Sequence, residues 1–331
     1  MKKHGYGIGS MWYGIGSTAA TNPSGAFVDF LDDGTAIVLS GCAEIGQGST
    51  TVLAQIAAET LGVDLEDVAV ITADTGVTPD AGPSSASRQT YISGNAVRLA
   101  AEKAREQVVA KAAELLDLDP VDIRLRHGQV WYEAEPTGRT IKDIIAQCRG
   151  EGILTLGHGS FNPVTTNLDP ATGQGTPYAT YAFATQIAEV DVDTETGIVE
   201  VKKIVAAHDV GTAVNPQNVE GQIEGGCSMG IGYALLEEVA VKDGKIQNPG
   251  LSSYLIPTAL DMPEIFPVIV EATEPSGPYG AKGVGEPALV PTAAAIANAV
   301  ADALGIRLYD LPLTPERVVA EIKALDSLKP E

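Results

Sequence analysis

A glycine-rich segment near the end of the chain presents a single carboxylate. Residues 281–287 read Ala-Lys-Gly-Val-Gly-Glu-Pro and lead into an apolar run that continues to Ile296. Glycines let the backbone come close to a bound group, so the spacing predicts that the carboxylate of Glu286 is held beside a ligand. The apolar run predicts that Glu286 lies at the mouth of a helix, where compensation of the helix dipole is the simpler role for an acid.

Two further polar segments stand where a helix pattern begins. The first is Gly46-Gln47-Gly48, where backbone N–H groups can approach an anionic ligand and the Gln47 amide can both donate and accept hydrogen bonds. The second is Ala86-Ser87-Arg88-Gln89, whose hydroxyl, guanidinium and amide groups suit phosphates and polar heterocycles. An ordinary turn and a solvated serine-rich linker are the respective alternatives.

Another segment combines one acid with two amides. Asp209 and Asn215 lie in a predicted turn between a β-rich segment and a helix, and Gln222 is expected at the start of that helix. Asp and Asn side chains in turns commonly bond their own backbone. A local structural role is therefore the alternative to ligand binding for Asp209 and Asn215.

Together these segments resemble, in type and order, the cofactor segments of the xanthine dehydrogenase / aldehyde oxidase family of molybdenum hydroxylases. The resemblance implies that Glu286 is the general base beside the metal, and that the protein provides no direct metal ligand because a pterin carries the molybdenum. It implies cofactor contacts by Gly46, Gln47, Gly48, Ala86, Ser87, Arg88, Gln89, Asp209, Asn215, Gln222, Lys282, Gly283, Val284 and Gly285. Arg88, Gln89, Asp209 and Asn215 are expected at the phosphate and base end of the cofactor.

The cofactor implied by the resemblance is molybdopterin cytosine dinucleotide, whose molybdenum has a terminal sulfido or selenido ligand. The three cysteines, Cys42, Cys148 and Cys227, are far apart and cannot supply the four-cysteine set of an iron–sulfur cluster. Neither a zinc site nor a flavin signature is evident. The [2Fe–2S] centres and the FAD are therefore expected on partner subunits, which would receive the electrons.

The chain also resembles the C-terminal half of a divided molybdenum subunit, because an undivided subunit is much longer. The medium molybdopterin subunit of nicotinate dehydrogenases has this size. This resemblance implies a large molybdopterin subunit, an iron–sulfur subunit and an FAD subunit as partners. It also implies hydroxylation of an N-heteroaromatic substrate, nicotinate to 6-hydroxynicotinate, with oxygen from water. Tyr13, Ser17 and Thr18 lie where longer relatives place the substrate channel.

Other functions compete with this interpretation. Members of the same family act on purines or aldehydes, and a structural subunit could keep the fold without the cofactor. The presence of Glu286, Gln47 and Gln222 argues against a structural subunit. A nicotinamide-dependent enzyme would need a Gly-x-Gly-x-x-Gly segment after a strand and an acid about twenty residues later, and the chain has no such pattern.

Composition limits the classes of partner. The chain has 331 residues and a formal net charge of −22 at pH 7, which argues against nucleic acids and anionic membrane surfaces as partners. No apolar run is long enough to span a bilayer, and the N-terminus lacks the pattern of a signal peptide. Together with the isolated cysteines, these features predict a cytoplasmic protein.

Hydrophobic patterning predicts an α+β fold with two similar lobes, a first cofactor-binding lobe at 1–155 and a second at 156–331 that carries Glu286. Gly157-His158-Gly159 and residues 167–173 are predicted as the connector between the lobes. The predicted strands are 26–31, 35–40, 68–72, 123–125, 129–132, 182–192, 198–207 and 268–272. The predicted helices are about 50–61, 91–116, 140–148, 222–236, 288–304 and 315–325.

Overall fold

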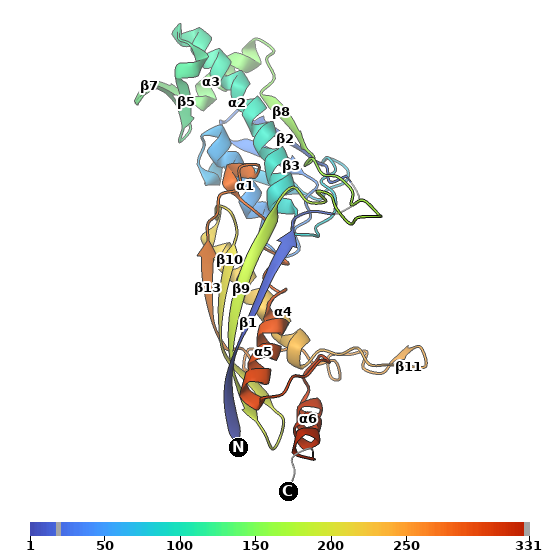
Figure 1. The fold of residues 1–331 in the computed structure, drawn as a ribbon. Coiled ribbons are helices and arrows are strands. Elements are labelled where there is room, and N and C mark those ends of the chain that lie inside the picture. The colour runs from blue at the N-terminus through green and yellow to red at the C-terminus, as the bar shows by residue number, and fades with distance from the viewer. Residues whose placement is uncertain (18–20, 328–331) are drawn as a thin grey trace.

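The chain folds around two four-stranded sheets, in a computed structural model that describes residues 1–17 and 21–327. Figure 1 shows an elongated molecule with one sheet toward each end and the N-terminus at the same end as α6. The strands are β1 (Lys2–Gly14), β2 (Ser24–Phe30), β3 (Ala36–Ser40), β4 (Val68–Thr72), β5 (Ile123–Arg126), β6 (Gln129–Tyr132), β7 (Glu135–Thr140), β8 (Leu156–Phe161), β9 (Tyr181–Asp193), β10 (Val199–Asp209), β11 (Val241–Lys242), β12 (Lys245–Ile246) and β13 (Glu264–Val270). The helices are α1 (Ser49–Leu61), α2 (Gly94–Leu116), α3 (Ile141–Gly150), α4 (Pro216–Leu235), α5 (Thr292–Leu304) and α6 (Pro315–Ser327).

The two sheets have the same design. In the first, the antiparallel hairpin β2-β3 is flanked by parallel β4 and antiparallel β8, giving the order β4-β3-β2-β8. In the second, the hairpin β9-β10 is flanked by parallel β13 and antiparallel β1, giving the order β1-β9-β10-β13. A helix, α1 or α4, connects each hairpin to its parallel strand. The predicted α+β fold is confirmed.

Each sheet packs one face against helices. Val28 and Phe30 of β2 lie in a core with Ile56 of α1 and Val97 of α2. In the second sheet, alternate residues of β9 and β10 pack against α4 and α5. The four side chains named in the first core are at most 1% exposed, and burial of each contributes about 1.5–3 kcal/mol to stability.

Glycines on the flanking strands permit unusually close contact with these helices. A Cβ atom on Gly157 or Gly159 of β8 would lie 2.0 or 2.1 Å from a backbone oxygen of α2. A Cβ atom on Gly7 of β1 would lie 2.1 Å from the Ala299 nitrogen of α5. The prediction that Gly157–Gly159 belongs to a connector is therefore wrong, because this segment is a paired strand whose glycines admit the helix.

The sheets exchange strands across the predicted division at residue 155. β1, near the N-terminus, completes the second sheet, whereas β8, just after residue 155, completes the first. The two-domain division stays a prediction. Within residues 1–17 and 21–327, no helix is long and apolar enough to cross a membrane.

Candidate active site

Two segments that are distant in sequence, at Tyr13 and at Ala86-Ser87, converge on the carboxylate of Glu286. Its Oε2 accepts hydrogen bonds from the Tyr13 hydroxyl at 2.7 Å and from Ser87 Oγ at 3.0 Å. Its Oε1 accepts one from the backbone N–H of Ala86 at 3.2 Å, and the N–H of Glu286 donates to Ser87 Oγ at 2.9 Å. The predicted proximity of Ala86, Ser87 and Glu286 is thus present in the fold.

Tyr13 remains a hydrogen-bond donor in this arrangement. Burial, followed by the hydrogen bond to the Glu286 carboxylate, raises the pKa of the Tyr13 phenol above its usual value. The phenol therefore stays protonated at neutral pH and holds one carboxylate oxygen in place. Sequence reasoning placed Tyr13 in a substrate channel and did not foresee its contact with Glu286.

Glu286 lies in a turn and not at the mouth of a helix, so that prediction is wrong. Hydrogen bonds from Leu289 N to Glu286 O and from Thr292 N to Leu289 O form successive turns, and α5 begins only at Thr292. Proline disfavours the helical conformation of the residue before it, so Pro291 delays the start of the helix. The helix dipole therefore does not explain an acid at this position.

Gly283 is required for the contact between the glycine-rich loop and Ser87. A Cβ atom at Gly283 would lie 1.7 Å from the Ser87 backbone oxygen, whereas a Cβ atom at Gly285 would come no closer than 3.7 Å to its neighbours. Gly283→Ala should therefore displace the loop and lower stability by about 1–3 kcal/mol, the range for overpacking. Gly285→Ala is the matched control and should change the melting temperature little. Equal melting temperatures for the two variants would contradict this assignment.

A buried ion pair connects the same loop to the end of β10. Lys282 Nζ lies 2.7 Å from Asp209 Oδ2 and donates to the Tyr181 carbonyl at 3.0 Å, and the two charged side chains are only 7% and 10% exposed. The other carboxylate oxygen of Asp209 accepts the Gly211 N–H. Asp209 and Lys282, both predicted to contact the cofactor, thus bind each other at the glycine-rich loop.

A buried polar network holds the far side of the loop, and sequence reasoning missed it. The Gln186 amide donates to the Ala288 carbonyl at 2.9 Å and to His208 Nε2 at 3.0 Å, and its oxygen accepts the Thr292 hydroxyl. Burial lowers the pKa of His208 to about 4, which keeps the imidazole neutral as an acceptor. A glutamine at an inward-facing position of β9 was the available signal.

The Gly46-Gln47-Gly48 turn is bonded mostly within itself. Gln47 accepts the Ile45 N–H and donates to the Ala43 carbonyl and to Ser49 Oγ. Glu44, another residue that was missed, accepts hydrogen bonds from the N–H groups of Gly46, Gly48 and Thr50 and from the Ser49 hydroxyl. The N–H groups of Gly46 and Gly48 are therefore already occupied by a carboxylate of the chain.

The acid stability of this turn should depend on Glu44. Burial alone would raise its pKa, but the hydrogen bonds outweigh burial and lower the pKa from 4.5 to about 2. A carboxyl group whose pKa is lowered by folding stabilises the folded state at a pH above its unfolded-state pKa. This stabilisation is lost as the pH falls through the pKa of the folded state. The difference in unfolding free energy between wild type and Glu44→Gln should therefore be constant above about pH 5 and shrink toward pH 2. Chemical denaturation at a series of pH values tests this, and a difference that does not depend on pH would contradict it.

Arg88 and Gln89 face inward. Arg88 is 1% exposed, and its guanidinium donates to the carbonyls of Ala81, Pro83, Asn22 and Pro23. Gln89 donates to the Pro83 carbonyl. The two terminal nitrogens of Arg88 are thus occupied by backbone carbonyls and only its buried Nε lacks a partner, so its position in the fold corresponds to holding the loop that presents Ala86 and Ser87.

The remaining predicted cofactor residues meet around one small cavity of about 50 Å³. Gln47, Asn215, Gln222, Lys282 and Val284 all line it. The prediction that Gln222 lies at a helix start is wrong, because α4 begins at Pro216, where the Asn215 side chain caps it by accepting the Asn218 N–H. Asn218 also lines the cavity and was missed.

An open recess of about 560 Å³ adjoins the Glu286 cluster. Its walls include Trp12, Tyr13, Ser17, Ala86 and Tyr178. The predicted substrate residues Tyr13 and Ser17 thus lie together, while Thr18 falls outside the described residues. Two of the lining residues, Tyr13 and Ala86, donate hydrogen bonds to the Glu286 carboxylate, so the recess lies beside the Glu286 cluster.

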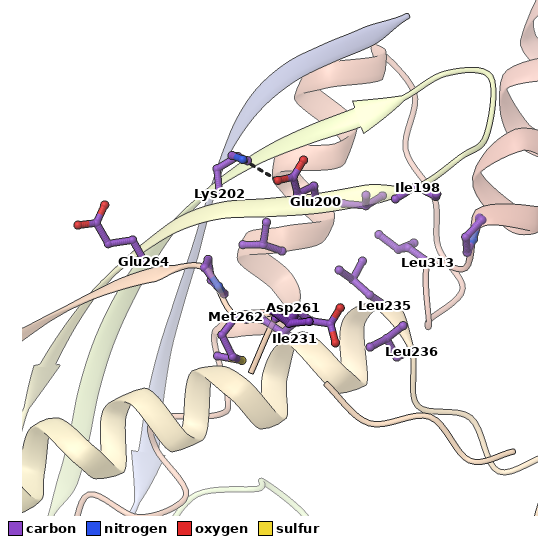
Figure 2. Close-up of a pocket in the computed structure, with 15 residues that line it drawn as sticks. Ile198, Glu200, Lys202, Ile231, Leu235, Leu236, Asp261, Met262, Glu264 and Leu313 are labelled. Carbon is purple, nitrogen blue, oxygen red and sulfur yellow. Dashed lines mark hydrogen bonds and ion pairs between the residues drawn. The ribbon is translucent and has the colours of Figure 1, made fainter. Parts of the chain in front are cut away.

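A separate cavity of about 590 Å³ lies at the opposite end of the second sheet (Figure 2). It lies between the start of β10 and the end of α4, where Ile198, Leu235 and Leu313 form apolar walls. Its ion pair, Glu200–Lys202 at 2.6 Å, is solvent-exposed. It shares no lining residue with the Glu286 recess.

Comparison with known proteins identifies the family of this chain. Residues 1–263 match the family model of the molybdopterin cofactor-binding domain. The chain belongs to the xanthine dehydrogenase / aldehyde oxidase family of molybdenum hydroxylases. The family resemblance found in the sequence is thereby confirmed.

Individual relatives are similar over most of the chain. The xanthine dehydrogenase molybdenum-binding subunit of Escherichia coli O157:H7 is 38% identical over 308 residues, covering 90% of this chain and 39% of that subunit. Subunit gamma of the 6-hydroxypseudooxynicotine dehydrogenase complex of Paenarthrobacter nicotinovorans is 31% identical, covering 88% of this chain and 37% of that subunit. The crystal structure of quinoline 2-oxidoreductase from Pseudomonas putida 86 superposes with a TM-score of 0.86 at 31% identity, covering 97% of this chain and 42% of that one. The chain thus spans about two fifths of these relatives.

The free polar groups on and next to the wall of the small cavity have the chemistry that a molybdopterin, an anionic and hydrogen-bonding ligand, requires, and a cavity of about 50 Å³ would admit only part of it. The Gln222 side chain and the backbone N–H groups of Gly283, Val284 and Gly285 make no hydrogen bond within residues 1–17 and 21–327. Free amides of this kind are suitable donors to anionic and heterocyclic acceptors. Among the residues that the structure describes, no cluster of three or more His, Cys, Asp or Glu side chains could hold a metal ion directly.

Proposed function

We propose that this chain is the cofactor-binding part of a hydroxylase in which Glu286 is the general base. The observation that carries the proposal is the convergence of Tyr13, Ala86 and Ser87 on the Glu286 carboxylate beside an open recess. A base must be held at a fixed position beside the proton that it removes. Three donors from two segments meet that requirement, which a surface carboxylate with one partner would not.

The bound molybdenum cofactor would supply the two-electron acceptor and the site at which water becomes a nucleophile. The chain's own part is to bind and orient that group and to remove a proton. Glu286 Oε2 already accepts two hydrogen bonds, whereas Oε1 accepts one, so Oε1 is the atom with a free lone pair for the proton. Tyr13 and Ser87 keep the carboxylate oriented while Oε1 reacts.

For the cofactor, we propose molybdopterin cytosine dinucleotide with a terminal sulfido or selenido ligand on the molybdenum. Gln222 and Val284, on the wall of the small cavity, and their neighbours Gly283 and Gly285 would donate hydrogen bonds to it, and Gln47 and Asn215 also lie on that wall. Arg88, Gln89, Asp209 and Lys282 would act mainly by holding the loops that surround it, because their polar groups bond within the protein.

Nicotinate is the substrate we favour, with 6-hydroxynicotinate as the product. Quinoline, in the name of one similar enzyme, is a flat N-heteroaromatic compound, and Trp12, Tyr13 and Tyr178 provide aromatic walls for such a ring. A large molybdopterin subunit, an iron–sulfur subunit and an FAD subunit would complete the enzyme. A purine is the second candidate substrate, because the chain is 38% identical to part of a xanthine dehydrogenase subunit.

The direct experiment is to isolate the native complex through a tag on this chain. Nicotinate, other N-heterocycles, purines and aldehydes are then screened for hydroxylation, and molybdenum and pterin are measured in the same sample. Hydroxylation of an N-heterocycle by a molybdenum-loaded complex is the expected result. A complex without molybdenum and pterin would refute the proposal and favour a structural subunit.

The two glutamines should respond differently to removal. Gln222→Ala should lower the molybdenum and pterin content of the complex with little change in thermal stability, because its amide has no partner within the described residues. Gln47→Ala should lower both cofactor content and stability, since its half-buried amide closes the turn before α1 and each typical hydrogen bond contributes about 0.5–1.5 kcal/mol. Full cofactor content in both variants would show that these glutamines are structural.

A further inference from the structure

One face of the second sheet is covered and the other is bare. Helices α4 and α5 pack on the same face of β1-β9-β10-β13, and Figure 1 shows no helix over the opposite face. Side chains alternate strictly along β9, with Ala182, Ala184, Gln186 and Ala188 buried and their odd-numbered neighbours outward. Large apolar side chains on the bare face are Tyr6, Ile8, Trp12, Phe183, Ile187, Phe266, Val268 and Val270.

These apolar side chains, with Ser10 and Thr185 between two of the apolar pairs, form one surface, which we call the open face. The strand register places Ile8 opposite Ile187 and Trp12 opposite Phe183. Ile187 in turn lies opposite Val205, and Val205 lies beside Phe266. An antiparallel sheet with one solvated face normally turns polar residues to water. Here one row, Ile8-Ile187-Val205-Phe266, is apolar across all four strands, and such exposure is typical of an interaction site.

We propose that the open face is the docking surface for the remaining portion of the molybdenum-binding unit of the same enzyme. The chain corresponds to only 39% of the E. coli xanthine dehydrogenase subunit and 42% of quinoline 2-oxidoreductase, so more than half of each has no counterpart here. That missing portion is the occupant to which the proposal commits. The inference rests on the proposed function, because it assumes that this chain works within such a unit.

Continuity with the recess supports this occupant over an unrelated protein. Trp12, which is 69% exposed, lies on the open face and also lines the recess beside Glu286. The recess is open, and Glu286 itself is exposed. A partner seated on the open face would therefore also close the recess and exclude water from the carboxylate, as base catalysis in a dry site requires. A second copy of this chain would add no site residue that the first copy lacks.

Lys203 provides a natural probe of the open face. It lies beside Glu264 in the strand register, and its Nζ lies 4.1 Å from the centroid of the Phe266 ring. An amine-reactive cross-linker applied to the native complex should join Lys203 to lysines of the occupant. The expected peptides match the part of the E. coli subunit that this chain does not span.

A pair of variants in the tagged chain completes the test. Ile8→Glu puts a charge into the open face at a residue that is 58% exposed, and Val241→Glu does so at a residue of similar exposure, 62%, on β11, which projects away from both sheets in Figure 1. Ile8→Glu should lower recovery of the remaining portion by about tenfold or more, and Val241→Glu should not. Circular dichroism and melting temperature confirm that both variants fold.

Each other outcome contradicts either the proposal that the open face is an interface or the proposed identity of its occupant. Equal recovery in both variants, with Lys203 cross-linked only within its own chain, would show that the open face is not an interface. Cross-links between Lys203 residues of two copies would show that the occupant is a second copy. The molybdenum content of the wild-type complex is read separately, so its absence would refute the proposed function while the cross-links still report on the open face.

Discussion

Glu286→Gln in the assembled enzyme is expected to lower turnover by at least ~10²-fold while the molybdenum content stays full. Glutamine keeps the size of the side chain and can still accept hydrogen bonds from Tyr13 and Ser87, so the loop should keep its position. It cannot take up the proton that a general base removes. Steady-state kinetics together with metal analysis of the same sample measures the effect.

Two comparisons make this result specific. Glu66→Gln removes an exposed carboxylate far from the site in the sequence and should leave turnover unchanged. Tyr13→Phe removes one hydrogen bond to Glu286 and should reduce kcat by less than Glu286→Gln does, because Ser87 and Ala86 still hold the carboxylate. Near-normal turnover of Glu286→Gln with full molybdenum would exclude Glu286 as the base.

The second large effect is expected at the buried ion pair. Asp209→Ala leaves the ammonium of Lys282 without its partner in a site where both side chains are at most 10% exposed. Breaking a buried pair in this way typically costs about 3–5 kcal/mol. The free energy of unfolding, measured with urea, should fall accordingly, and the cofactor content of the complex should fall with it.

The double variant Asp209→Ala/Lys282→Met tests the cause. It removes the unpaired charge as well, so it should recover much of the lost stability, since apolar replacements of buried ion pairs are often tolerated. If the double variant were as unstable as Asp209→Ala, the loss would come from packing and not from the uncompensated charge.

The regular parts of the fold were predictable because local signals and tertiary structure agree there. The turn Asp32-Asp33-Gly34 between two alternating segments predicted the hairpin that β2 and β3 form. The same reasoning failed at Gly157 and Gly159, where glycine allows a strand to touch a helix and does not mark a loop. Glycine has both uses, and only the packed structure distinguishes them.

The site was predictable in its parts but not in its contacts. The glycine-rich spacing singled out Glu286, and the serine-rich loop singled out Ala86 and Ser87. The contact of Tyr13 with Glu286 joins residues 273 positions apart, which no local pattern encodes. Predicted phosphate contacts at Arg88 rested on charge alone, whereas the fold surrounds its guanidinium with backbone carbonyls.

Isotope labelling of the product tests the central claim most directly. The complex isolated through this chain is supplied with nicotinate in water enriched in oxygen-18, and the product is analysed by mass spectrometry. If Glu286 serves a molybdenum hydroxylase, each molecule of 6-hydroxynicotinate should carry one atom of oxygen-18. Product whose new oxygen comes from dioxygen, or no hydroxylated product from any N-heterocycle, purine or aldehyde despite full molybdenum loading, would contradict the account.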